Sequence, residues 1–265
     1  MTKIERICSI CGTWSEPYAL NDITRPIILH SSIYRCLKCG LLICNPRHTK
    51  IELDAFYQNY WQREHPEYLA EKYDSDPLWV SYSTLISSKL RSGRVIDLGC
   101  GTGGFLKLFK GFELHGIEPD PVAVEHCRAI GISSVVCGDI EGADLGDCIY
   151  DVVVLWHVIE HLLDFMQVLN CIYRCLKPKG YIIIGTENYD NRNVRLRRYC
   201  SFLRFKIPEI TTATEHTFLF HPKSLRGALQ KSRFDIDHIQ TYRLIDGKYH
   251  RSADGDLMAA MARKK

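Results

Sequence analysis

Long hydrophobic runs, an apolar leader and a strong charge of one sign are all missing from this 265-residue sequence. No apolar stretch approaches the roughly 18 residues that a membrane-spanning helix needs. The opening MTKIERICSICG has no apolar core of the kind that a signal peptide carries. A formal net charge of +3 gives no support for a stable nucleic-acid partner. With 46% hydrophobic and 25% charged residues, we expect a soluble globular protein of the cytoplasm.

Cysteine, in contrast, is abundant. The chain has 12 cysteines, and four of them form two Cys-x-x-Cys pairs, each followed by glycine: Cys8 with Cys11, and Cys36 with Cys39. In a reducing compartment such pairs bind a metal ion more often than they form disulfides. Four thiolates with no open coordination position are typical of structural Zn²⁺. We therefore predict a zinc ribbon over residues 1–50 that acts as a scaffold or as a cap over the substrate.

Residues 51–77 are predicted to form a helical linker that is rich in aromatic side chains. The rings belong to Phe56, Tyr57, Tyr60, Trp61, Tyr68 and Tyr73. Either these rings pin a helix to the main domain, or one or two of the tyrosines reach into a substrate pocket. Over residues 77–90 the apolar residues recur on one face of a helix.

From residue 94 onward, short apolar strands alternate with helices. The strands lie in RVIDL, FELHGIE, SSVVCGDI, YDVVVLW and GYIIIGTEN, and the helix before the last of them is expected to end at Gly180. This alternation predicts an α/β fold with a doubly wound, mainly parallel sheet that is covered on both faces. Ligands of such sheets bind at the carboxyl ends of the strands.

The first strand leads into the turn Gly99-x-Gly101-x-x-Gly104, and Glu118 ends the next strand. The same spacing is found in dinucleotide-binding folds, where an acid in this position binds ribose. Asp97, however, lies at the strand end just before the glycines and would repel a diphosphate. A cofactor with a cationic amino-acid end would be attracted by that carboxylate. The turn therefore favours S-adenosylmethionine over NAD.

Together, VIDLGCGTGGF, GIEPD, GDI, LWHVIEHL and LKPKGYIIIGTEN resemble the class I S-adenosylmethionine-dependent methyltransferases over roughly residues 78–245. The resemblance implies a Rossmann-like sheet of seven strands within a methyltransferase domain at 78–265. It also implies that nine residues contact the cofactor: Asp97, Gly99, Cys100, Gly101, Glu118, Pro119, Asp139, Ile140 and Trp156. Among them, Glu118 would bind both ribose hydroxyls and Asp139 the adenine amino group.

The segment around Glu215 and His216 resembles the small-molecule and sugar branch of this family, which includes deoxysugar C-methyltransferases with an N-terminal zinc ribbon. This resemblance implies that His216 is the general base, that Glu215 orients it and that His161 is a further active-site histidine. His157 and His161 are four residues apart and are expected on one face of a helix. The general likeness to ubiquinone-type enzymes favours O-methylation over C-methylation. We expect the acceptor to be a sugar, a nucleotide-sugar or a surface-glycan precursor.

Residues 190–206 form a basic amphipathic stretch within a predicted lid insertion at 190–215. The stretch could be a lid with a solvated face, a binding site for a substrate phosphate, or a weak contact with anionic lipid. Two other classes of function stay open. One is an RNA or protein methyltransferase that recognises its macromolecular substrate through the ribbon. The other is a binding module without catalytic activity. The intact Asp97, Glu118 and Asp139 argue against the second.

Overall fold

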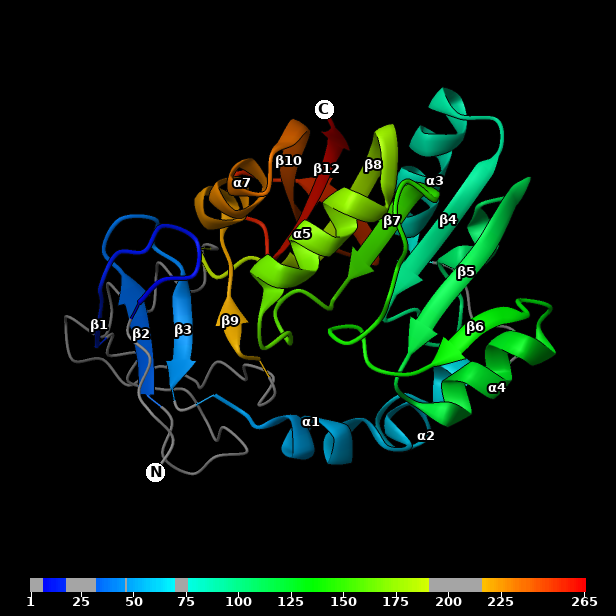
Figure 1. Ribbon diagram of the computed structural model, residues 1–265, viewed down its shortest axis with the longest axis horizontal. Helices are drawn as coiled ribbons and strands as arrows, with labels where there is room; N and C mark the ends of the chain where they lie inside the picture. The colour runs from blue at the N-terminus through cyan, green and yellow to red at the C-terminus, as the bar shows by residue number, and fades with distance from the viewer. Residues whose placement is uncertain (1–6, 18–31, 46, 70–75, 191–215) are drawn as a thin grey trace.

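A computed structural model describes residues 7–17, 32–45, 47–69, 76–190 and 216–265 (Figure 1). Glu215 and all but the first residue of the predicted lid at 190–215 lie outside the described residues. Within the described ranges, no helix combines the length and the apolar character needed to cross a membrane.

A sheet of eight strands forms the centre of the molecule, in the order β11-β10-β12-β8-β7-β4-β5-β6. Its strands are β4 (Gly93–Leu98), β5 (Phe112–Glu118), β6 (Ser134–Cys137), β7 (Tyr150–Trp156), β8 (Leu176–Glu187), β10 (Phe234–Ile245), β11 (Lys248–Arg251) and β12 (Leu257–Lys264). Strands β4 to β8 pair in parallel, and β12 is antiparallel to both of its neighbours. The mainly parallel α/β sheet is therefore confirmed.

The count of seven strands was wrong, because β11 adds an eighth at the edge. It pairs with β10 through a two-residue turn at Asp246 and Gly247, whose φ angles are 49° and 72°. Two positive φ angles in a two-residue hairpin loop are typical of a type I′ turn, for which Asp-Gly is a favoured sequence. The signal for this strand was thus present in the sequence.

Helices cover both faces of the sheet. They are α3 (Pro77–Lys89), α4 (Pro121–Ala129), α5 (Phe165–Cys175) and α7 (Pro222–Lys231), with a short 3₁₀ turn η2 (Leu106–Leu108) after β4. Along β7, Val153 and Leu155 pack in the cluster that contains α5 and α7, whereas Val152 and Val154 pack with α3 and α4. This alternation follows from the two-residue period of a strand and confirms the doubly wound arrangement. Each of these buried side chains contributes about 1.5–3 kcal/mol to folding.

Helix α5 ends five residues earlier than expected. Leu176 follows it with extended backbone angles and pairs with Tyr150 as the first residue of β8. The cause is Pro178, which disfavours a helical conformation at the preceding Lys177. The prediction of a helix up to Gly180 was therefore wrong, because residues 176–180 belong to β8.

The N-terminal segment forms a second, smaller sheet of antiparallel strands in the order β1-β2-β3-β9. These strands are β1 (Ser15–Pro17), β2 (Ser32–Cys36), β3 (Leu42–Asn45) and β9 (Phe218–Leu219). The last of them comes from much later in the sequence, two residues after His216, and pairs with β3. The small sheet is thereby joined by backbone hydrogen bonds to the domain that follows it.

Between the two sheets the chain runs through α1 (Lys50–Tyr57), α2 (Tyr60–Glu64) and the 3₁₀ turn η1 (Pro66–Leu69). Figure 1 shows α1 and α2 passing below the large sheet, at the end toward which β4 and β5 point. This segment therefore crosses the carboxyl edge of the parallel strands, where a ligand is expected.

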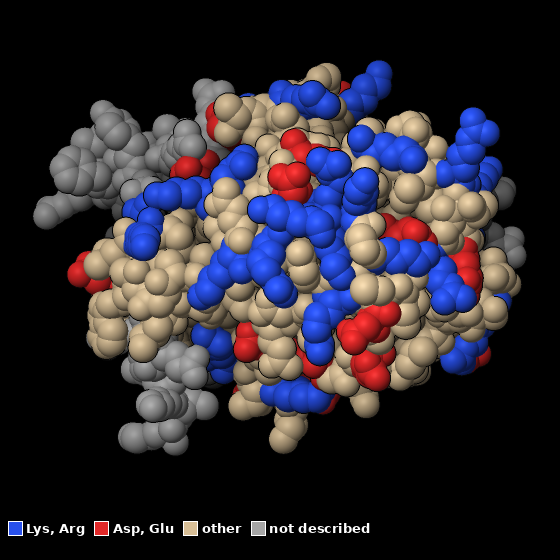
Figure 2. All heavy atoms as spheres, turned by 45° about the horizontal axis from the view of Figure 1, so that its top comes forward, with Lys and Arg blue, Asp and Glu red and all other residues tan. Residues whose placement is uncertain are grey.

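In Figure 2 the molecule is turned so that the amino ends of the parallel strands face the viewer. Many Lys and Arg side chains lie on this face. Lys264, on β12, donates from Nζ to the carbonyl oxygens of Leu176 (2.6 Å) and Arg174 (3.3 Å). A positive charge at the carboxyl end of α5 stabilises that helix through its dipole.

Candidate active site

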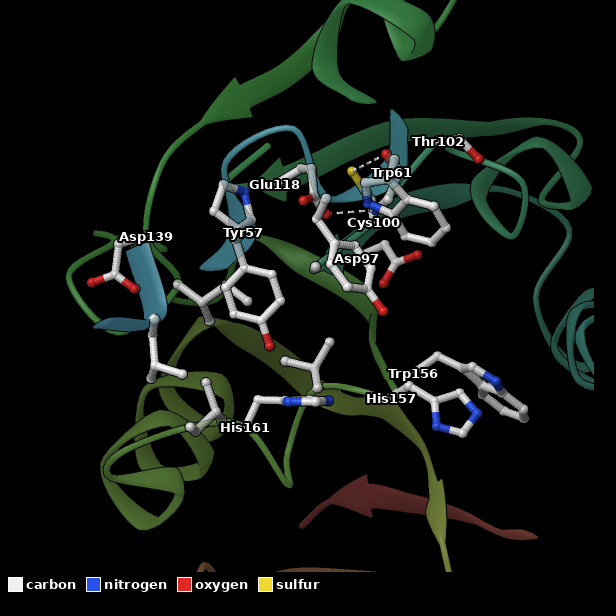
Figure 3. A pocket seen from close by; sticks show the side chains of 18 of the residues that line it. Tyr57, Trp61, Asp97, Cys100, Thr102, Glu118, Asp139, Trp156, His157 and His161 are labelled. Carbon is white, nitrogen blue, oxygen red and sulfur yellow. Dashed lines mark hydrogen bonds between the residues drawn. The ribbon is translucent and has the colours of Figure 1, made fainter. Parts of the chain in front are cut away.

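A cavity of about 480 Å³ lies between the carboxyl edge of the large sheet and the segment α1–η1. All nine residues that were expected to contact a cofactor line this cavity, and so do His161 and His216. Figure 3 shows Glu118 and Trp61 on one side and His157 and His161 on the other. The fold therefore brings the predicted cofactor residues and the predicted catalytic histidines into one site.

The glycine turn after β4 is fixed by backbone conformation and by close packing. Gly99 and Gly101 have φ angles of +81° and +53°, which L-residues rarely adopt. A Cβ at Gly99 would lie 2.5 Å from Cγ2 of Val158, and one at Gly101 would lie 2.4 Å from Cζ2 of Trp61. Larger residues at these two positions would both strain the turn and fill the space beside the cavity.

Glu118 ends β5 as a buried carboxylate with two backbone donors. The N–H of Gly101 donates to Oε2 at 2.8 Å, and the N–H of Asp120 donates to Oε1 at 3.1 Å. Burial raises the pKa of Glu118 to about 7, although these two hydrogen bonds favour its ionised form. The side chain of Trp61 is a third partner that favours the ionised form, so acceptance of two hydroxyl groups would require Trp61 to give up this contact.

Asp97 is 3% exposed, and its Oδ1 has no hydrogen-bond partner among the described residues. Burial, together with the nearby charge of Glu118, raises the pKa of Asp97 well above its usual value. An unpartnered buried carboxylate is costly unless a ligand with a positive charge or a hydrogen-bond donor satisfies it. The side chain therefore fits the ammonium end of S-adenosylmethionine and would oppose a diphosphate.

Asp139, at the far side of the cavity, forms an ion pair with a residue that was not expected there. Its Oδ2 lies 3.2 Å from Nζ of Lys50, the first residue of α1. Lys50 also contacts Asp54 at 3.0 Å. All three side chains are more than one-third exposed, so water screens these pairs and they add little stability. The adenine contact expected of Asp139 would have to share its carboxylate with Lys50.

Aromatic side chains of the linker cover the cavity. Tyr57, Tyr60, Trp61 and Tyr68 line it, which agrees with the interpretation that tyrosines of this segment reach a pocket. A hydrogen bond attaches this segment to the large domain: the backbone N–H of Trp61 donates to Oδ2 of Asp120 at 2.9 Å. Tyr73, which was part of the same prediction, lies outside the described residues.

The turn after β7 does not form the helix that was expected to carry His157 and His161 on one face. His157 has a positive φ of 54°, and the chain continues through turns as far as His161. As a result, Nδ1 of His157 lies 3.4 Å from Oε1 of Glu160, whereas the ring of His161 packs against His216 at 4.6 Å between centroids. The shared helical face was therefore a wrong prediction.

Glu160 was not recognised from the sequence as a site residue. It is fully buried, and neither carboxylate oxygen has a hydrogen-bond partner among the described residues. Burial alone would raise the pKa of this carboxyl, but the neighbouring imidazoles, that of His157 first, lower it to about 2. An acid within the apolar run LWHVIEHL was the signal that could have revealed it.

His216 is oriented by two further residues that the sequence interpretation missed, Glu187 and Tyr189. The hydroxyl of Tyr189 donates to Oε2 of Glu187 at 2.7 Å and lies 2.9 Å from Nδ1 of His216. Since that hydroxyl proton is used by Glu187, the network assigns the proton of the neutral imidazole to Nδ1. The lone pair of His216 is then on Nε2.

The backbone around His216 links the turn after β7 to the small sheet. The N–H groups of Thr217 and Phe218 donate to the carbonyl oxygen of Glu160, at 2.8 and 3.0 Å. The carbonyl oxygen of Thr217 accepts from the N–H of Cys44, at the end of β3, at 3.0 Å. The position of His216 therefore depends on the small sheet as well as on the large one.

The four predicted metal ligands of the small sheet come together. The sulfur atoms of Cys8, Cys11, Cys36 and Cys39 lie within 4.8 Å of one another. Two of the sulfur pairs are 3.5 and 3.3 Å apart, which is near the roughly 3.8 Å edge of a tetrahedron with Zn–S bonds of about 2.3 Å. Gly12 and Gly40 close the two knuckles with φ angles of +65° and +77°. The residues therefore fit a structural Zn²⁺ ion.

Comparisons with known proteins agree with this fold. A family model described as a methyltransferase domain matches residues 55–239. Sterol 24-C-methyltransferase of Eremothecium gossypii is 32% identical over 158 residues, and ubiquinone biosynthesis O-methyltransferase of Pseudomonas savastanoi is 29% identical over 150. These alignments cover 54% and 52% of this chain, but only 40% and 61% of the two relatives. The chain thus spans less than two-thirds of either relative.

A solved structure of similar fold is a methyltransferase of Thermotoga maritima, described as S-adenosylmethionine-dependent and as a possible histamine N-methyltransferase. Its TM-score is 0.56 at 20% identity, and the alignment covers 80% of this chain and 98% of that one. At this level of identity the likeness shows the fold and leaves the acceptor open.

Proposed function

Because the chain belongs to the methyltransferase domain family, we propose that it transfers a methyl group from S-adenosylmethionine to a hydroxyl oxygen of a small polar acceptor. The acceptor class that we propose is a sugar, a nucleotide-sugar or a surface-glycan precursor. One observation carries the proposal. A single cavity joins the buried carboxylates of Asp97 and Glu118 to the His161–His216 pair.

The strand ends and the glycine turn would hold the cofactor. Asp97 would neutralise its ammonium group, and Glu118 would accept hydrogen bonds from both ribose hydroxyls. Gly99 and Gly101 allow the backbone to approach it, and Trp61 with the linker tyrosines would exclude water from it. S-adenosylmethionine supplies a methyl group on a sulfonium sulfur, which keeps the bonding electron pair and leaves as a neutral thioether.

The histidine side of the cavity would take the acceptor. As the hydroxyl oxygen bonds to the methyl carbon, its proton would pass to Nε2 of His216, whose Nδ1–H is held by Tyr189. The new cation would be stabilised by Glu187, whose Oε2 lies 3.8 Å from Nδ1 of His216. We propose oxygen as the methylated atom because a hydroxyl proton can be taken by one imidazole without further activation of the substrate.

The variant His216→Ala tests this assignment. We expect methyl transfer to fall about 10²- to 10⁴-fold, the usual contribution of a general base, while S-adenosylhomocysteine binds as before. The assay would measure transfer from methyl-labelled S-adenosylmethionine to a panel of nucleotide-sugars and phosphorylated glycans. His115→Ala, which changes a partly exposed histidine on β5, is the matched control. Unchanged turnover of the His216 variant would contradict the proposed base.

Binding of S-adenosylhomocysteine is expected to depend on pH through Glu118. The pKa of this group is about 7 in the free protein, and the carboxylates of Asp97 and Asp120 face it. Because the ligand would bind the ionised form, affinity should weaken at least about tenfold for each pH unit below 7. Calorimetric titration from pH 5.5 to 8.5, in buffers of different ionisation enthalpy, would also detect the released proton. An affinity that stays constant over this range would contradict the role of Glu118.

A further inference from the structure

We infer that Glu160, His161 and His216 form a second metal site, which binds a divalent first-row transition-metal ion on the acceptor side of the cavity. Each of the three residues offers one ligand atom, and these atoms lie within 4.8 Å of one another. Ligands at about 2.0–2.2 Å from one ion are separated by about 3–4 Å. Small changes of side-chain rotamer would therefore be enough to bring the three atoms onto one ion.

The buried carboxylate is the first independent argument for this site. Both oxygens of Glu160 lack a hydrogen-bond partner among the described residues, although the side chain is completely buried. Its Oε1 lies 3.4 Å from Nδ1 of His157. Oε1 is thus already paired with an imidazole, whereas Oε2 is buried without a hydrogen-bond partner among the described residues and would be satisfied by a cation.

The orientation of His216 is the second argument. Tyr189 occupies Nδ1 of this ring, so Nε2 carries a lone pair. A neutral imidazole whose other nitrogen donates a hydrogen bond is the usual form of a metal-bound histidine. The backbone of Thr217 and Phe218 ties the ring to Glu160 through its carbonyl oxygen, which keeps the ligand set together without the ion.

The donor set also indicates which ions would bind. Two imidazoles and one carboxylate suit Mn²⁺, Fe²⁺, Co²⁺ or Zn²⁺, whereas the four thiolates of the ribbon select Zn²⁺. The two sites are therefore chemically distinct. Because His161 and His216 line the cavity, the remaining coordination positions of the ion would face the acceptor.

The consequence for catalysis rests on the proposed methyl transfer. An ion at this position would bind the acceptor oxygen and lower the pKa of its hydroxyl group. It would also occupy the lone pair of His216, so the hydroxyl proton would pass to a solvent water molecule instead of to this histidine. The site then favours an acceptor that offers two neighbouring oxygens to the ion, such as a vicinal diol or a hydroxyl beside a carboxylate.

The test is a titration of Mn²⁺ into protein that carries one zinc ion per chain, enough for the ribbon alone, and binding is measured as the loss of the free-Mn²⁺ signal in electron paramagnetic resonance. Mn²⁺ prefers oxygen and nitrogen ligands and does not displace zinc from thiolates. We expect one Mn²⁺ per chain in addition to the ribbon zinc, with the affinity reduced more than about 100-fold in Glu160→Gln and in His161→Asn. Glu113→Gln and His115→Asn change another glutamate–histidine pair, at 2.9 Å on β5, and serve as matched controls.

Two readouts keep this inference separate from the proposed function. Thermal unfolding and calorimetry with S-adenosylhomocysteine show whether each variant is folded and binds the cofactor. A protein that binds S-adenosylhomocysteine but no Mn²⁺, or that binds Mn²⁺ equally in Glu160→Gln and wild type, overturns the metal site alone. A protein that binds Mn²⁺ at this site but not S-adenosylhomocysteine overturns the methyltransferase proposal and leaves the metal site intact.

Discussion

Removing zinc from the ribbon is expected to reduce methyl transfer strongly, although none of the four predicted cysteine ligands lines the cavity. Structural zinc sites contribute about 10–16 kcal/mol of apparent binding free energy to the folding of small domains, so the ribbon should unfold without its ion. Strand β9, which pairs with β3, would then lose its partner. His216 lies two residues before β9 and should be displaced with it.

The double variant Cys8→Ser with Cys39→Ser is the clearest way to make this measurement. We expect about one zinc per chain in the wild type and none in the variant. Turnover should fall at least 100-fold, which is the loss expected when the base is misplaced, while the affinity for S-adenosylhomocysteine changes less than about threefold. Cys137→Ser, at an exposed position on β6, should keep both zinc and activity. Full turnover in a zinc-free, folded variant would show that the ribbon does not position His216.

The variant Glu118→Gln is expected to weaken binding of S-adenosylhomocysteine about 100-fold or more. Hydrogen bonds to a charged group contribute about 1.5–3 kcal/mol each, and this carboxylate would make two of them to the ribose. Every 1.4 kcal/mol corresponds to a factor of ten in affinity. Glutamine has one acceptor oxygen instead of two and carries no charge, so the loss of at least one such bond and the weakening of the other account for the predicted effect.

Stability should respond differently from affinity. The pKa of Glu118 is about 7 in the folded chain and near 4.5 in an unfolded one, so ionised Glu118 destabilises the free protein as the pH rises above 4.5. Glu118→Gln removes this cost, and its thermal midpoint at pH 7.5 should stay within a few degrees of wild type. Glu125→Gln, on the exposed side of α4, is the matched control for both measurements. Wild-type affinity in a folded Glu118 variant would remove this residue from the cofactor site.

Local features of the sequence were enough to place Asp97 and Glu118 together at the carboxyl edge of the sheet. Asp97 and Glu118 end neighbouring parallel strands, and the register of β4 with β5 places Leu98 beside Ile117. Parallel strands end at the same edge of a sheet, so two acids at consecutive strand ends must lie close together. The glycine turn between them is equally local, because its positive φ angles are available mainly to glycine.

Other features were local as well but were interpreted wrongly. Asp246 and Gly247 signalled a hairpin, and the eighth strand that follows them was not predicted. Pro178 signalled the end of α5, and the helix was nevertheless expected to continue to Gly180. In the turn after β7, the spacing of His157 and His161 suggested a helix, whereas a positive φ at His157 ends any regular structure there.

By itself, the sequence determined the parallel α/β sheet, the two Cys-x-x-Cys pairs and the acids at neighbouring strand ends, because each depends on residues that are near one another in the chain or on consecutive strands. Only the tertiary structure brought Glu160 and His161 to His216, 55 residues beyond His161, and placed Trp61 above Gly101. It also paired β9 with β3, across more than 170 residues of sequence. Contacts of this kind have no local signal, since side-chain packing and loop closure over the whole chain decide which distant residues meet.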